Sequence, residues 1–159
     1  MKIKLIVVGN LKEKYWKDAQ NEYLKRISKY AKVELIELKD LPIKGNCSDK
    51  DLEQVKVNEG QRILQKIKPQ DFVVLLDLNG PQYTSPEMAS QLDKWFVSGG
   101  SNITFVIGGS LGLSEEVKKR GNATITLGKI TLPHQLCRIV LLEQIYRCFK
   151  INNNETYHK

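Results

Sequence analysis

Short apolar runs alternate with segments of helical periodicity along the whole chain, and this alternation is the feature that most limits the fold. The expected strands are rich in β-branched and apolar residues; they cover residues 2–8, 33–38, 72–78, 103–107 and 123–127. The expected helices cover residues 12–30, 49–68, 85–98, 114–121 and 133–151. Such alternation favours a parallel sheet with helices on both faces. We therefore predict an α/β three-layer sandwich with a mostly parallel sheet of five or six strands, in one domain over residues 1–159.

Local patterns place some of these elements within the fold. Residues 72–78 and 103–107 are almost continuously apolar, which is typical of strands buried on both faces. Residues 33–38 alternate apolar and charged side chains, which indicates a strand near an edge of the sheet. Ser85 followed by Pro86 is typical of a helix start, and we expect Ser85 to be the N-cap.

The last expected helix, residues 133–151, is apolar over most of its circumference. Only Glu143, Arg147 and Lys150 form a clear polar stripe. A helix of this kind must be buried on several sides, whereas an outer helix of a three-layer domain keeps one face in water. The helix either packs centrally in one chain or forms a subunit interface. We favour the second explanation and predict a symmetric homodimer.

The composition limits the classes of protein to which this chain can belong. The apolar run at residues 5–8 is too short for a signal-peptide core, and no stretch reaches the roughly 20 apolar residues that cross a bilayer. The three cysteines, Cys47, Cys137 and Cys148, show no C-x-x-C spacing, so neither a disulfide framework nor a zinc site is expected. We predict a cytoplasmic protein with no membrane and no metal.

The net charge of +7 is concentrated near the N-terminus. Residues 1–32 hold nine Lys and Arg against three Asp and Glu, a net charge of +6, and the remaining 127 residues hold 16 against 15. A one-sided basic patch suits a phosphate-rich partner. It is equally compatible with a solvated helix face on a basic protein.

Two turns are candidates for ligand binding. Residues 105–113 run from a buried strand into three glycines, and glycine allows a ligand to approach the backbone closely. Tight packing of strand against helix would also need these glycines. In residues 127–135 the backbone N–H groups at the start of the last helix are free for a ligand, and Thr131 either caps that helix or contacts the ligand. Neither a P-loop nor a G-x-G-x-x-G turn is present.

Several separated motifs resemble the RlmH family of SPOUT methyltransferases. They are Ile-Gly-Gly-Ser-Leu-Gly-Leu at 107–113, Thr-Leu-Pro-His-Gln-Leu at 131–136, Glu-Gln-Ile-Tyr-Arg at 143–147 and Tyr-His-Lys at 157–159. Residues 8–15 are similar to the N-terminus of that family. The motifs follow the family order over the whole chain. Gly128 stands where the family pattern has a serine.

The resemblance implies features that the residue patterns do not. It implies a C-terminal trefoil knot, which general topology rules disfavour. It implies a homodimer and methyl transfer from S-adenosylmethionine to N3 of a pseudouridine in 23S rRNA, on the assembled ribosome. The implied cofactor contacts are Leu76, Gly108, Leu127, Gly128, Lys129, Ile130, Thr131 and Leu132. The candidates for RNA contact are Lys12, Lys14, Lys17 and Arg26.

Methyl transfer requires N3 to be aligned with the methyl carbon and its imide proton to be removed. By resemblance, His158 is the base or orients it, and Tyr157 stacks on the flipped target base or binds it. Composition alone would leave His158 in a disordered tail. Arg138 either binds phosphate or pairs with Glu143, whereas Arg147, four residues after Glu143, is expected by default to form a helix salt bridge.

Two other functions remain open. One is a SPOUT enzyme that methylates tRNA, which purified tRNA as substrate would reveal. The other is a non-enzymatic RNA-binding α/β protein, which would fail to bind S-adenosylmethionine.

Overall fold

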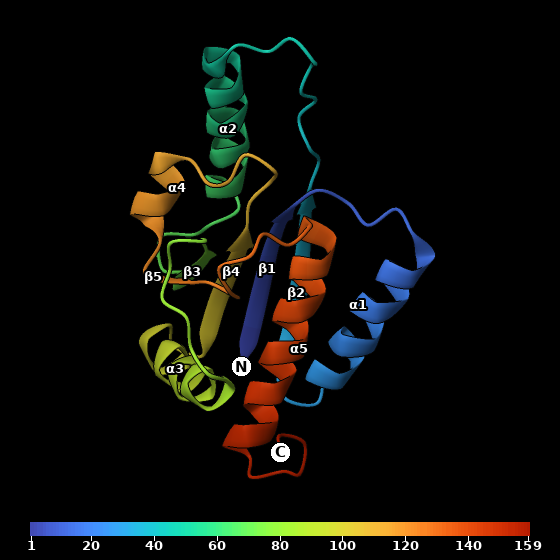
Figure 1. The fold of residues 1–159 in the computed structure, drawn as a ribbon. Coiled ribbons are helices and arrows are strands. Elements are labelled where there is room, and N and C mark those ends of the chain that lie inside the picture. The colour runs from blue at the N-terminus through green and yellow to red at the C-terminus, as the bar shows by residue number, and fades with distance from the viewer.

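A parallel five-stranded sheet lies between two layers of helices in the computed structural model, which describes all of residues 1–159 (Figure 1). The strand order is β2-β1-β4-β3-β5, and every neighbouring pair is parallel. The strands are β1 (Lys2–Val8), β2 (Lys32–Leu38), β3 (Val73–Leu76), β4 (Asn102–Ile107) and β5 (Ala123–Ile125). The helices are α1 (Lys14–Ile27), α2 (Asp49–Leu64), α3 (Ser85–Ser98), α4 (Glu115–Arg120) and α5 (His134–Asn152). The predicted α/β sandwich is confirmed, with five strands; the trefoil knot stays a prediction.

The two faces of the sheet bury separate cores. One core contains apolar residues of α1, α3 and α5, with Phe105 of β4 at its centre. The other contains residues of α2 and α4, including Ile63 and Val117. β4 lies between β1 and β3 and is buried along almost its whole length, as its apolar run predicts. β2 lies at the edge, as its alternating pattern predicts.

The predicted N-cap of α3 is wrong by one residue. Thr84, not Ser85, caps the helix: its hydroxyl accepts a hydrogen bond from the N–H of Glu87, and the Glu87 carboxylate accepts one from the N–H of Thr84 at 2.7 Å. This reciprocal capping box needs a hydroxyl three residues before the acid, and Thr84 has that spacing. Ser85 instead donates to Gln144 of α5 at 2.8 Å.

Helix α5 is buried along only part of its circumference. Leu141, Leu142 and Ile145 have no exposed surface. Near its N-terminal end, however, Ile139 and Val140 are only half-buried in the single chain. A half-buried apolar surface on a helix is compatible with the predicted homodimer, which stays a prediction.

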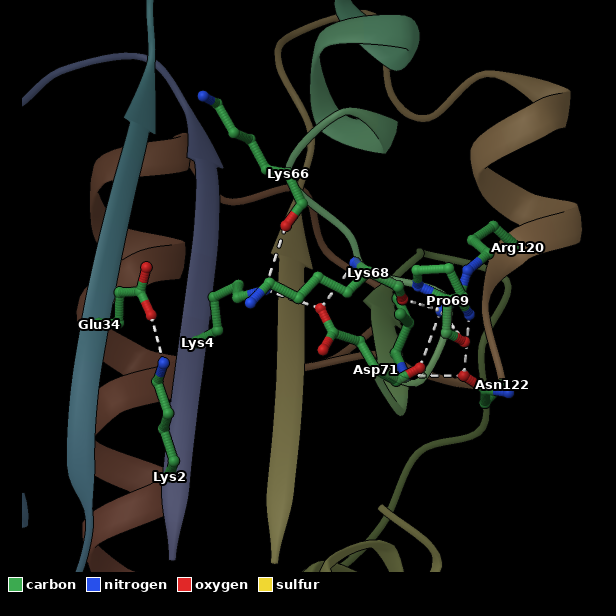
Figure 2. A network of polar contacts seen from close by, with 10 residues as sticks. Lys2, Lys4, Glu34, Lys66, Lys68, Pro69, Asp71, Arg120 and Asn122 are labelled. Atoms are coloured by element: carbon green, nitrogen blue, oxygen red, sulfur yellow. Dashed lines mark hydrogen bonds and ion pairs between the residues drawn. The ribbon is translucent and has the colours of Figure 1, made fainter. Parts of the chain in front are cut away.

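An ion-pair network fixes the turn between α2 and β3 (Figure 2). Nζ of Lys4 donates to Oδ2 of Asp71 at 2.7 Å and to the carbonyl of Lys66 at 3.1 Å. Arg120, the last residue of α4, donates to the carbonyls of Lys68 and Asp71, each at 2.9 Å. Burial alone would raise the pKa of Asp71, but the hydrogen bonds from Lys4 and Lys68 and the charge of Lys4 outweigh it. The pKa of Asp71 is lowered below its ordinary value.

Lys4→Ala is expected to lower the free energy of unfolding by about 3 kcal/mol, because it leaves the Asp71 carboxylate buried without its cation. The side chains of Lys4 and Asp71 are only 10% and 11% exposed. Because the folded pKa of Asp71 is lowered, the stabilisation is present above its ordinary pKa and disappears as the pH falls through the folded value. Chemical denaturation of the parent and variant, at neutral pH and in acid, measures both effects.

The neighbouring exposed ion pair is the matched control. Nζ of Lys2 lies 2.6 Å from the Glu34 carboxylate, but the two side chains are 45% and 42% exposed (Figure 2). Lys2→Ala should therefore cost less than about 1 kcal/mol. If Lys2→Ala and Lys4→Ala lowered the free energy of unfolding equally, burial would not be what makes the Lys4–Asp71 pair the more important one.

No helix of the structure combines the length and the apolar character needed to cross a membrane. No group of three or more His, Cys, Asp or Glu side chains is placed to hold a metal ion.

Candidate active site

A cavity of about 600 Å³ opens at the carboxyl end of the sheet. Its wall is formed by the segments that follow β3, β4 and β5, with side chains from α2, α4 and the first turn of α5. This is the edge at which parallel α/β sheets bind ligands, and the volume lies within the usual range of small-molecule sites. The cavity is the leading candidate for a cofactor site.

The glycine turn after β4 lines this cavity, and its shape depends on the absence of side chains. A Cβ at Gly108 would lie 2.8 Å from Cδ2 of Leu113 and 3.1 Å from the carbonyl oxygen of Gly112. Gly112 has a φ of +82°, which other residues rarely adopt. The glycines thus serve the tight packing of the turn and also leave its backbone open to the cavity, so both explanations of this motif apply.

The segment between β5 and α5 lines the cavity with residues 127, 128 and 130–132. The N–H groups of residues 129–132 donate to no acceptor in the protein. The hydroxyl of Thr126 instead holds the turn at Gly128, donating to its carbonyl at 2.7 Å. Thr131 does not cap α5, because Pro133 occupies the N-cap position and no side chain caps the helix. A row of free donors in a concave site is suited to ligand oxygen and nitrogen acceptors.

The mouth of the cavity combines apolar and charged side chains. Leu78 and Ile130 line it and are 58% and 75% exposed, which is unusual for large apolar residues. On the same wall, Nζ of Lys118 lies 3.9 Å from Oδ2 of Asp77, with Lys56 nearby in the lining. A ligand with a flat apolar part and a charged end would satisfy both features.

The predicted cofactor contacts fall largely on this cavity. The residues found in its wall are Leu76, Gly108, Leu127, Gly128, Ile130, Thr131 and Leu132, and only Lys129 is not. Sequence reasoning missed Asp77, Lys56 and Lys118. Asp77 had a signal, since it interrupts an otherwise apolar run of residues. The two lysines had none, because they come from helices far from either glycine turn in sequence.

His134, the first residue of α5, also lines the cavity. Its Nδ1 is buried with no hydrogen-bond partner, and it packs against Gly9. Gly9 has a φ of +108°, and a Cβ there would lie 2.6 Å from Cε1 of His134. The turn after β1 must therefore be glycine for the imidazole to remain beside the cavity.

A second polar cluster lies at the far end of α5, where the chain turns back on itself. Oη of Tyr157 donates to Oε1 of Glu143 at 3.1 Å, and Nη2 of Arg147 donates to the same oxygen at 2.7 Å. Nη1 of Arg147 lies 3.2 Å from Nδ1 of His158. The predicted Glu143–Arg147 salt bridge is confirmed. We call Glu143, Arg147, Tyr157 and His158 the tail cluster.

The tail segment is held in place by other contacts as well. The Glu155 carboxylate accepts hydrogen bonds from Oη of Tyr30 at 2.9 Å and from Nζ of Lys150 at 2.6 Å. The ring of Tyr157 packs edge-on against Tyr146 with the centroids 4.9 Å apart. The tail is therefore an ordered part of the structure, contrary to the composition-based alternative of a disordered end.

The single chain does not bring the tail cluster to the cavity. Cys137 is the last residue of α5 in the cavity wall, and Arg147 follows ten residues later. A helix rises 1.5 Å per residue, so about 15 Å of helix separates them. If His158 and Tyr157 act at the cavity, they must come from a second chain.

Arg138, the third catalytic candidate, lies neither in the cavity wall nor in the tail cluster. It is 1% exposed, and its guanidinium donates to Glu37 at 2.7 Å, to Gln20 at 3.0 Å and to the carbonyl of Gly9 at 2.9 Å. It does not pair with Glu143, and a phosphate cannot reach it in this arrangement. Arg138 joins α5 to α1, β2 and the turn after β1, and through Gly9 it supports His134.

The four predicted RNA contacts differ in their availability. Lys14 pairs with Asp18 at 2.6 Å and Arg26 pairs with Glu22 at 2.8 Å. Lys12 is exposed and has no carboxylate partner. The same is true of Lys17, and also of two residues of this region that were not predicted, Lys25 and Lys29. Free lysines are therefore spread along α1 and the turn before it.

The parallel sheet, the glycine turn and the cavity at the carboxyl edge define an α/β protein with a site for a small ligand. The family model described as predicted SPOUT methyltransferase matches residues 1–158, and the chain belongs to this family. The chain is also 53% identical over 159 residues, all of both sequences, to a protein of Enterococcus faecalis (strain ATCC 700802 / V583) named ribosomal RNA large subunit methyltransferase H.

Proposed function

We propose that this protein methylates 23S rRNA on the assembled ribosome, transferring a methyl group from S-adenosylmethionine to N3 of a pseudouridine. The observation that carries the proposal is the cavity with free backbone donors, in a SPOUT chain that matches a named ribosomal RNA methyltransferase over its full length. We also propose that residues 1–159 act as one domain and that the protein works in the cytoplasm, where ribosomes are.

The residues of the cavity fit S-adenosylmethionine. The exposed apolar side chains of Leu78 and Ile130 suit contact with an adenine ring, and the free N–H groups of residues 130–132 suit its nitrogen acceptors. Asp77 and Lys118 suit the ammonium and carboxylate of the methionine part. When bound, the cofactor supplies a methyl carbon activated by the adjacent sulfonium.

We propose that a homodimer completes the site. The half-buried apolar surface of α5 is a suitable interface, and antiparallel packing of two α5 helices would bring the tail cluster of one chain to the cavity of the other. The roughly 15 Å between the two sites within a chain is the geometric reason for a second copy.

Labelled S-adenosylmethionine tests the proposed function. Ribosomes from a strain lacking this gene are incubated with the protein, and free 23S rRNA and tRNA are assayed alongside. Label on the ribosome, mapped to N3 of a pseudouridine, supports the proposal. Label on tRNA would favour the other SPOUT enzyme class. Failure to bind S-adenosylmethionine would favour a non-enzymatic RNA-binding protein.

The free lysines predict a salt-dependent step in ribosome binding. Lys12→Gln with Lys17→Gln should reduce the slope of log affinity against log salt by about 2, because each free lysine that contacts phosphate releases about one counterion. Ribosome binding measured at several salt concentrations gives this slope. The double variant Lys44→Gln with Lys50→Gln removes the same charge from exposed positions away from α1. Equal slopes for the two double variants would contradict an RNA-binding role for this surface.

A further inference from the structure

We propose that His158 serves the reaction as a hydrogen-bond donor through Nε2–H and that, together with Arg147, it stabilises an anionic form of the target imide. This assigns Arg147 to the reaction and gives His158 a role different from the expected one, which was to be the base or to orient it. The inference rests on the proposed function, in which the tail cluster faces the target base.

The contact between Arg147 and His158 fixes the role of each imidazole nitrogen. A guanidinium has only donors, and it keeps its proton at any pH the protein experiences. Nη1 of Arg147, 3.2 Å from Nδ1 of His158, must therefore donate, and Nδ1 must accept. A neutral imidazole with an accepting Nδ1 carries its proton on Nε2. The nitrogen that remains for the substrate is then a donor with no lone pair to take up a proton.

The other members of the tail cluster do not offer a base either. Glu143 is engaged at both oxygens: Oε1 accepts from Arg147 and Tyr157, and Oε2 accepts from Gln144 at 2.6 Å. Burial raises the pKa of the Tyr157 phenol, and the charge and hydrogen bond of Glu143 raise it further. Tyr157 therefore stays protonated at neutral pH.

The fixed donors of the cluster favour an anion, although each nearby arginine is also paired with a carboxylate. Arg147 lies 4.7 Å from the centroid of the Tyr157 ring and is held by Glu143, so its position is fixed in advance. From α1, Tyr23 acts on Arg147 and Tyr157, and Arg26, which is paired with Glu22 at 2.8 Å, acts on Tyr157. Fixed donors placed where negative charge develops are the usual means by which enzymes stabilise such charge.

The chemical step balances without a protein base. The imide N3–H of the target loses its proton to water, and the negative charge is shared by N3 and the two flanking carbonyl oxygens. Nε2–H of His158 and the guanidinium of Arg147 are suited to bind those oxygens. The N3 lone pair then forms the bond to the methyl carbon, the carbon–sulfur bond breaks, and its electron pair stays on sulfur.

The tautomer can be measured without activity. The protein has two histidines, His134 and His158, so ¹⁵N-histidine labelling gives a simple NMR spectrum in which His158→Gln identifies the signals of His158. At a pH where the imidazole is neutral, we expect an unprotonated Nδ1 and a protonated Nε2 for His158. A protonated Nδ1 would overturn the inference, whether or not the protein methylates RNA.

A matched set of variants separates a donor from a base. The terminal amide N–H of Gln lies near the position of Nε2, that of Asn lies near Nδ1, and neither amide takes up a proton at neutral pH. We expect His158→Gln to retain activity within about tenfold of the parent, and His158→Asn and His158→Ala to lose about 10²- to 10³-fold. Position 158 is exposed, so S-adenosylmethionine binding should be equal in all four proteins.

The pH profile gives the second readout. For a donor, the methylation rates of the parent and His158→Gln rise together with pH as the imide ionises. If His158 were a base, the pH–rate profile of the parent would contain a rise in the histidine range that is missing from His158→Gln. That variant would also be as inactive as His158→Ala. These results would overturn the inference. A parent protein that methylates no RNA would be a failure of the proposed function instead.

Discussion

Removal of residues 157–159 is expected to reduce methyl transfer by about 10³-fold or more and to leave S-adenosylmethionine binding unchanged. The deletion removes the His158 donor and the Tyr157 ring, and the loss of one preorganised donor alone typically costs 10²- to 10³-fold. The cavity is formed by other segments, and Cys137, the last α5 residue in its wall, lies about 15 Å of helix from Arg147, the residue that contacts His158. Methyl incorporation and calorimetric titration with S-adenosylmethionine measure the two quantities separately.

A mixing experiment tests whether two chains share each site. Gly108→Val should block the cavity, since even a Cβ there lies 2.8 Å from Cδ2 of Leu113. The truncated chain and Gly108→Val should each be inactive alone, whereas a mixed dimer has one intact cavity facing one intact tail. Recovery of activity on mixing is expected, and deletion of Lys159 alone is the control for shortening the chain. Full activity of the truncated protein would exclude a catalytic role for the tail.

Arg138→Ala is expected to lower the free energy of unfolding by about 5 kcal/mol, the largest loss we expect from any single substitution discussed for this chain. It empties the space of a fully buried side chain and removes the donor from Gln20 and from the Gly9 carbonyl. Glu37 is 36% exposed and can be partly hydrated, so most of the loss comes from the buried partners. A loss of this size is comparable to the whole stability of many domains. Urea denaturation measures it.

The same substitution tests whether Arg138 has a catalytic role. Arg26→Ala removes an arginine from a solvent-exposed pair four residues apart and should change the denaturation midpoint little. If Arg138→Ala kept the denaturation midpoint of the parent and lost only turnover, Arg138 would act on the substrate, and the structural role assigned to it would be wrong.

The arrangement of the elements could be predicted because each strand has a distinct pattern. The continuous apolar run of β4 and the alternation of β2 reflect two-sided and partial burial, and the structure places these strands inside the sheet and at its edge. The exact start of α3 depended on which of two adjacent hydroxyls has the capping-box spacing to Glu87. The hydrophobic pattern does not report cap geometry, so it cannot fix a helix boundary to within one residue.

The site could be predicted only where its parts are local in sequence. The glycine turn and the segment after β5 were each recognised as a candidate ligand site beside a structural explanation, and both line the cavity. Arg138 was misjudged because its partners Gln20 and Glu37 lie 118 and 101 residues away. The separation of the tail cluster from the cavity, in contrast, follows from helix length. Ten helical residues, about 15 Å, separate Cys137 in the cavity wall from Arg147, which contacts His158.

The free backbone donors of residues 129–132 bear on how this protein can vary through evolution. Every residue except proline has an N–H, so a site that binds through its main chain tolerates changes of side chain. Gly128, where the family pattern has a serine, then requires no compensating substitution. A proline at residues 129, 130 or 131 would be far more damaging than a change of charge or size. If the cofactor binds these donors as proposed, drift of side chains in this segment is a poor indicator of altered cofactor use.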